Sequence, residues 1–137
     1  MNQITEDFVS FEIAKLLKEK GFDNEEVSEN GGFYCDYECD GTDIGIVYES
    51  EMLNKDLARN EYLRPTHQMT IKWLREVHRI ETHIVLSELN ADNSRKYMFD
   101  IYSSDINRDF DSVQKEGFNS YEQAVEAACL YVLKNLI

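Results

Sequence analysis

Carboxylates spaced two residues apart precede a glycine in the first third of the chain. The pattern is that of the opening half of an EF-hand calcium loop: Asp36, Glu38, Asp40 and Gly41. The second half does not fit, because Asp43 stands at the usual apolar eighth position and Val47 replaces the bidentate glutamate at the twelfth. The flanks also have strand composition. We therefore interpret the stretch as an acidic hairpin and expect no metal site there.

Cysteine and histidine side chains could ligate zinc, but their spacing opposes a shared site. Cys35 and Cys39 on one extended strand would lie about 13 Å apart, and no C-x2-C knuckle is present. Cys129 falls in an alanine-rich helical pattern, where a thiol usually packs as a small apolar group. The nucleophile-elbow, H-E-x-x-H and glycine-rich phosphate-loop patterns are missing from the sequence. We expect free thiols, no catalytic residue, no cofactor and no metal.

Tyrosines on predicted strands and connections could stack a base or a sugar. They are Tyr34, Tyr37, Tyr48, Tyr62, Tyr97 and Tyr102. The basic groove that accompanies nucleic-acid stacking is missing from the sequence pattern, and half-exposed tyrosines are common on strands. A small-ligand pocket lined by some of these tyrosines, or an enzyme of unrecognised type, stays open as a lesser alternative.

Charge is the most unusual property of the sequence. The 137 residues carry 27 acidic and 14 basic side chains, a net charge of −13, and from Asp23 to Glu51 there are ten carboxylates and no Lys or Arg. Such a surface repels nucleic acid and anionic membrane and favours cationic partners, although acidic charge also serves solubility alone. The predicted interaction surface comprises Glu25, Glu26, Glu29, Asp36, Glu38, Asp40 and Asp43, with a basic helical stripe of Lys72, Arg75 and Arg79.

Three segments have helical periodicity and end signals. The first is predicted to begin at a Thr5 cap and to stop at Gly21, with Phe8, Val9, Ile13, Leu16 and Leu17 buried. The second runs from Thr66 to His78, with Met69, Trp73, Leu74 and Val77 inward. The third begins at Ser120, where Gln123 completes a capping box, and buries Tyr121, Val125, Ala128, Val132 and Leu136.

Strand-forming runs separate these helices. A hairpin is predicted from residues 33–38 and 44–49, with Phe33 and Cys35 on the dry face and Asp36 on the wet one. A second hairpin joins residues 82–89 to 96–103, and residues 113–117 add a possible edge strand. Residues 51–62 are ambiguous between a short helix and an irregular crossing.

The order α-β-β-α-β-β-(β)-α predicts an α+β fold, an antiparallel sheet of four to five strands with three helices. Length, the near absence of proline and the lack of a linker favour a single acidic domain over residues 1–137. No apolar stretch is long enough to span a membrane, and the first residues lack the basic and apolar regions of a signal peptide. We expect a cytoplasmic protein that does not bind membrane.

Three helical segments resemble a family of small uncharacterised proteins of gut bacteria and their phages. They are TEDFVSFEIAKLLKEKGF from Thr5, PTHQMTIKWLREVHRI from Pro65 and SYEQAVEAACLYVLKNLI from Ser120. The family has no established activity or ligand, so the resemblance implies a setting on mobile or phage-derived DNA and carries over no functional residue.

The sequence favours a non-catalytic protein-interaction or regulatory module, with a protein partner or self-association and no direct contact to nucleic acid. Self-association could join the acidic hairpin to the basic stripe. The first alternative is an acidic mimic of nucleic acid that blocks a DNA-binding or defence protein.

Overall fold

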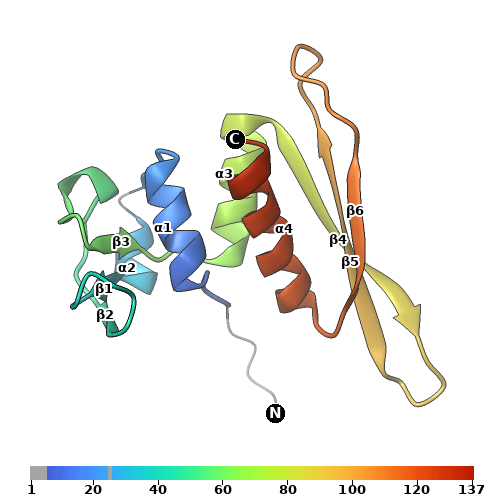
Figure 1. The fold of residues 1–137 in the computed structure, drawn as a ribbon, viewed down its shortest axis with the longest axis horizontal. Helices are drawn as coiled ribbons and strands as arrows, with labels where there is room; N and C mark the ends of the chain where they lie inside the picture. The colour runs from blue at the N-terminus through green and yellow to red at the C-terminus, as the bar shows by residue number, and fades with distance from the viewer. Residues whose placement is uncertain (1–5, 25) are drawn as a thin grey trace. The chain divides into compact units, whose positions relative to one another are not determined.

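The computed structural model describes residues 6–24 and 26–137, and it divides the chain into two compact units (Figure 1). The first unit is Met1–His67 and the second is Gln68–Ile137. Each has a three-stranded antiparallel sheet of its own, with helices besides. The α+β class is therefore confirmed, whereas the prediction of one sheet of four to five strands with three helices is wrong. The described residues form six strands in two sheets, and four α-helices.

The sheet of the first unit has the order β2-β1-β3. The predicted hairpin is confirmed as β1 (Phe33–Asp36) and β2 (Ile44–Val47), paired antiparallel. The third strand, β3 (Glu61–Leu63), and the 3-10 turn η1 (Asn54–Asp56) come from the ambiguous stretch. The buried amide of Asn54 organises this stretch, because its Nδ2 donates to the Phe22 carbonyl and its Oδ1 accepts from the Leu63 amide, both at 2.9 Å.

Helix α1 (Phe11–Glu19) begins later than the sequence predicted. Ser10 is its N-cap, with Oγ accepting from the Ile13 amide at 3.4 Å, and Phe8 is extended in a bridge to Thr66. The predicted cap, Thr5, lies outside the described residues. The predicted stop is confirmed, because Gly21 has φ +89° and the Phe22 amide donates to the Leu17 carbonyl at 2.9 Å.

A short helix, α2 (Val27–Gly31), lies between α1 and β1, outside the three predicted helices. It ends at Gly32, which has φ +63°, and a Cβ built there would lie 2.1 Å from the carbonyl oxygen of Val47. Glycine is thus required for both the backbone conformation and the close passage to β2.

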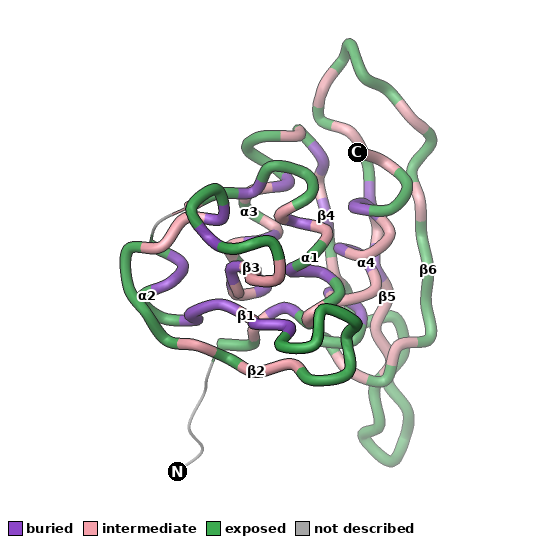
Figure 2. The backbone as a smooth tube through the Cα atoms, turned by 60° about the vertical axis from the view of Figure 1, so that its left-hand side comes forward, coloured by how far each residue is buried: buried purple, intermediate pink, exposed green. Residues whose placement is uncertain are grey.

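The core of the first unit forms between α1 and the sheet, and its buried stretches are purple in Figure 2. The apolar side chains buried there are Val9, Ile13, Ala14, Leu17, Phe22, Val27, Phe33, Cys35, Leu57 and Leu63. The predicted alternation holds for Phe33 and Cys35. It is wrong for Asp36, which is 6% exposed although the alternation placed it on the wet face.

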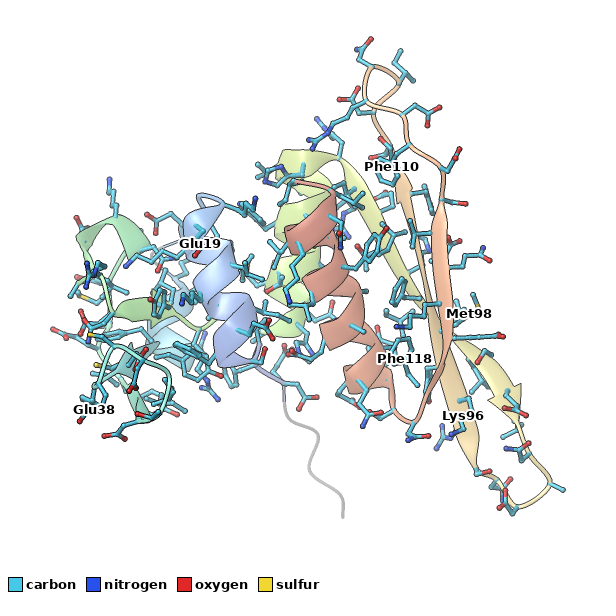
Figure 3. The ribbon with its side chains drawn as sticks, viewed as in Figure 1. Glu19, Glu38, Lys96, Met98, Phe110 and Phe118 are labelled. Carbon is cyan, nitrogen blue, oxygen red and sulfur yellow. The ribbon has the colours of Figure 1, made fainter. Side chains whose placement is uncertain are left out.

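In the second unit, α3 (His67–His78) leads into a sheet of order β4-β5-β6, which α4 (Tyr121–Asn135) packs against. The predicted second hairpin and edge strand are confirmed as β4 (Ile80–Leu89), β5 (Arg95–Ser103) and β6 (Val113–Phe118). Phe118 lies on the α4 side, stacked on the buried Phe99 at 5.8 Å between centroids, whereas Met98 projects from the other face (Figure 3).

The ends of the predicted helical stripes in this unit need correction. Ser120 caps α4, with Oγ accepting from the Gln123 amide at 3.1 Å, but Gln123 Oε1 accepts from the Asn119 amide instead of closing the box on Ser120. Tyr121 is 38% exposed and Val77 is 59% exposed, so neither is the buried residue that periodicity predicted. Both lie at helix ends, and the half-exposed Tyr121 ring still contacts Tyr97 of β5, at 6.0 Å between centroids. No helix in the described residues is long and apolar enough to cross a membrane.

Candidate functional site

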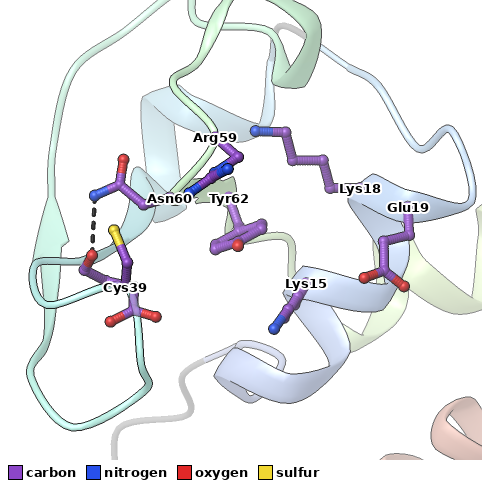
Figure 4. A pocket seen from close by; sticks show the side chains of 8 residues that line it. Lys15, Lys18, Glu19, Cys39, Arg59, Asn60 and Tyr62 are labelled. Carbon is purple, nitrogen blue, oxygen red and sulfur yellow. Dashed lines mark hydrogen bonds between the residues drawn. The ribbon is translucent and has the colours of Figure 1, made fainter.

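A cavity of about 530 Å³ lies in the first unit (Figure 4). Helix α1 forms one side, the end of β1 and its turn form another, and the segment between η1 and β3 closes it. Its lining side chains are Lys15, Lys18, Glu19, Asp36, Cys39, Arg59, Asn60 and Tyr62. The volume is within the range of small-molecule sites in proteins.

The lysines of α1 reach the cavity because residues three apart share one helix face. Lys18 is fixed, since its Nζ donates to the carbonyls of Ala58 and Glu61, both at 2.8 Å, and lies 5.2 Å from the centre of the Tyr62 ring. Partial burial lowers the pKa of Lys18, an effect that the carboxylates of Glu61 and Asp23 oppose. Two of its three N–H donors are used in these bonds. Lys15 is exposed, one turn earlier.

Asp36 closes the β1–β2 turn, and this explains its burial. Both of its carboxylate oxygens accept from the Gly41 amide, at 3.0 and 3.2 Å, and its backbone carbonyl accepts from Asn60 Nδ2 at 2.9 Å. The last bond is the dashed line in Figure 4. Cys39, in the same turn, is exposed and has φ +57°. Alternation along a strand does not predict the burial of Asp36 or the exposure of Cys39, because the strand ends at residue 36 and residues 37–43 form a turn.

Tyr62 lies at the centre of the view in Figure 4, with Lys15, Lys18 and Glu19 on one side and Asn60 and Cys39 on the other. Burial raises the pKa of its phenol, the carboxylates of Asp36 and Glu19 raise it further, and Arg59 acts in the opposite direction. The phenol therefore stays protonated at neutral pH and offers an O–H donor.

Positive charge is concentrated at this cavity within an acidic unit. Residues 1–67 contain 16 acidic and six basic side chains, a net charge of −10. Three of the six basic ones, Lys15, Lys18 and Arg59, line the cavity, against two lining carboxylates. The local excess of cations favours an anion there, although the unit as a whole repels one.

No protein-family model, curated protein or solved structure matches the chain.

The predicted acidic surface is brought together in part. Glu26 and Glu29 are exposed at α2, Glu38, Asp40 and Asp43 are exposed in the β1–β2 turn, and Asp36 lines the cavity. Glu25 lies outside the described residues. The basic residues Lys72, Arg75 and Arg79 are exposed in the second unit, but the predicted helical stripe is wrong at Arg79, which lies beyond the end of α3 with φ +56°. Arg75 Nε lies 3.4 Å from the neighbouring Glu76 carboxylate.

The cavity cations were missed at the sequence level. Lys15 and Lys18 are not among the residues predicted to form an interaction surface, and Arg59 falls in the ambiguous stretch. The usable signal was the three-residue spacing of the lysines, together with Tyr62, one of the six tyrosines considered for a small-ligand pocket. Within the described residues, no three His, Cys, Asp or Glu side chains are grouped so that they could hold a metal ion.

Proposed function

We propose that the chain is a non-catalytic binding module whose first unit binds a small organic anion in the cavity. The observation that carries the proposal is that half of the unit's basic side chains line this one cavity. The three cations outnumber the two lining carboxylates, so a ligand anion would balance the remaining positive charge.

The three cations of the cavity would contact a bound anion in different ways. Lys18 is held in place by two carbonyls and offers its remaining N–H, while the exposed side chains of Lys15 and Arg59 can close on a carboxylate or phosphate group. Arg59 supplies paired donors suited to such a group. The Tyr62 hydroxyl and the Asn60 amide add uncharged hydrogen-bonding groups.

Calorimetric or NMR titration of the full chain with citrate and with adenosine monophosphate tests this proposal, with glycerol as an uncharged comparison. We expect one or both anions to bind, and the affinity to fall about tenfold or more in Arg59→Gln and in Lys15→Gln, since each removes a charge-assisted hydrogen bond. Lys55→Gln is the matched control, because Lys55 is an exposed cation of the same unit that does not line the cavity.

Anion binding of unchanged strength in both Arg59→Gln and Lys15→Gln would contradict the proposed site. So would the failure of both anions to shift any resonance of the cavity residues. Inorganic phosphate is a useful further probe, since it separates recognition of the anionic group from recognition of the organic part.

A second candidate function is the occupation of a basic, nucleic-acid-binding surface on a partner protein, in a phage-derived setting. It is favoured by the exposed carboxylates of the β1–β2 turn and α2. The test is affinity capture from a nuclease-treated bacterial lysate with wild-type protein and with a variant in which Glu38, Asp40 and Asp43 are replaced by Lys. We expect the wild type alone to retain a DNA-binding protein. Equal retention by both would dispose of the acidic-mimic proposal.

A further inference from the structure

The outer edge of β4 in the second unit is a long strand edge whose second half is exposed. β4 has ten residues and, within the described chain, pairs with β5 on one side of the sheet. Three apolar side chains of that second half are well exposed, Val85 at 44%, Leu86 at 49% and Leu89 at 63%. An uncovered edge presents unpaired backbone N–H and C=O groups to any strand that can lie beside it.

The two edges of this sheet differ in how they are protected. β6 carries Gln114, Lys115 and Glu116 and ends near Gly117, which has φ +94°, and such charged and irregular edges discourage pairing. β4 has the sequence IETHIVLSEL, without Lys, Arg or Pro. Its charged side chains, Glu81 and Glu88, flank an uncharged run at residues 84–86, and a register shift lies between Leu86 and Glu88. The contrast indicates that one edge is kept from association and the other is not.

We propose that β4 pairs antiparallel with β4 of a second copy of this chain, joining two three-stranded sheets into one of six strands. A two-fold axis beside Val85 would place Val85 opposite its own copy and Ile84 opposite Leu86 of the second copy. The two Glu88 carboxylates then lie at opposite ends of the paired segment. An isologous strand edge is self-complementary, because each copy supplies the donors and acceptors that the other lacks.

Charge opposes contact between two copies less through this unit than through the first. The second unit has 11 acidic and eight basic side chains, a net charge of −3, against −10 for the first. Contact through β4 therefore joins the less acidic units. The residual repulsion between copies is screened by salt, whereas backbone hydrogen bonds and apolar contacts are not.

Sedimentation of the full chain over about 5 to 500 µM tests the pairing. The range is wide because an interface formed by one pair of strand edges is small, and small interfaces give weak dimers. We expect a concentration-dependent dimer that is stronger at high NaCl concentration. Val85→Lys should shift the dimer to monomer, since two like charges would face each other at the axis. Gln114→Lys, the same residue placed on the β6 edge, is the matched control and should dimerise as the wild type does.

Backbone amide exchange of the wild type gives a second measurement that needs no variant. Dimerisation should slow exchange at residues 83–89 as protein concentration rises, while β6 is unchanged. A monomer at every concentration would overturn the proposal, as would a dimer that survives Val85→Lys. A dimer that dissociates with added salt would instead indicate contact between the acidic turn and the basic stripe of α3, and would also overturn it.

Discussion

The three cysteine side chains occupy different environments, and this difference predicts their reactivity. Cys39 is exposed in the β1–β2 turn, Cys35 is 7% exposed, and Cys129 is fully buried in α4. Burial raises the pKa of Cys35, and the carboxylates of Glu61 and Asp36 add to it. Since the thiolate is the reactive form, we expect a disulfide reagent at pH 8 to modify Cys39 quickly and the other two after unfolding.

Mass spectrometry of the modified protein identifies which thiol reacted, and Cys39→Ser is the control, because it should remove the fast phase alone. Three thiols reacting at one common rate in the folded protein would contradict the buried positions of Cys35 and Cys129.

Burial of Cys129 also predicts a loss of stability in alkali. Its pKa is raised from 9.0 to about 12 because the thiol is desolvated, with a smaller contribution from Glu126. Above pH 9 the unfolded chain releases this proton and the folded chain keeps it, so stability is complete below pH 9 and falls as the pH rises towards 12. We expect the loss to reach about 2 kcal/mol near pH ~10.5.

Urea unfolding of the wild type and of Cys129→Ala across that range measures the difference. The variant should be less stable at pH 7 by about 1 kcal/mol through lost packing, and its stability should fall less steeply with pH. Burial lowers the pKa of Lys18, so its titration makes stability rise with pH, opposite to the effect of Cys129. Both proteins contain Lys18, so its effect cancels in the difference between their unfolding free energies. Parallel pH curves would contradict a buried neutral thiol.

At the scale of the element, the end of α2 depends on a glycine. A methyl group at Gly32 would lie 2.1 Å from the Val47 carbonyl oxygen and 3.2 Å from Tyr48 Cα, both backbone atoms that cannot move aside independently. We expect Gly32→Ala to displace β2 from α2 and to destabilise the first unit by several kcal/mol. Amide chemical shifts of β1 and β2 measure the displacement, and the thermal midpoint measures the loss of stability.

Gly41→Ala is the matched comparison, because Gly41 also has a positive φ, +82°, but a Cβ there meets no atom within 4 Å. It should cost the left-handed backbone strain alone, about 1 kcal/mol. Equal losses of stability in the two variants would show that the close approach of Gly32 to Val47 does not contribute to the effect of Gly32→Ala.

Elements with local signals were predictable, and those that depend on distant partners were not. Ser120 and Gly21 mark their helix ends in the sequence, and both operate in the structure. The start of α1 was not predictable, because Phe8 is held extended by a bridge to Thr66. The strand β3 likewise depends on Asn54, whose hydrogen bonds to Phe22 and Leu63 join segments far apart in sequence.

At the scale of the whole molecule, composition predicted the charge but not where it would gather. The acidic stretch from Asp23 to Glu51 is visible in the sequence, and most of its described carboxylates are exposed. The cavity instead combines residues from three separate segments, represented by Lys15, Cys39 and Arg59. Spacing within one element could not reveal that these side chains converge, since the turn and the η1–β3 segment bring them together.

The net charge of −13 makes the stability of the protein depend on salt. Repulsion among exposed carboxylates destabilises the compact state, and the screening length falls from about 30 Å at ~0.01 M to about 8 Å at ~0.15 M ionic strength. We expect the thermal midpoint to rise over this range. Glu38→Gln should reduce the rise, because Glu38 is exposed in the acidic turn. A variant that removes positive charge, such as Lys55→Gln, should enlarge it.

Added salt should act in different directions on fold stability and β4 pairing on the one hand and on anion binding on the other. Screening should stabilise the fold and strengthen pairing through β4, because both suffer from repulsion between acidic surfaces. It should weaken anion binding in the cavity, which draws on attraction to Lys15 and Arg59. A midpoint that falls with salt would mean that favourable ion pairs outweigh the repulsion, and the unpaired acidic surface on which the acidic-mimic proposal depends would then have to be abandoned.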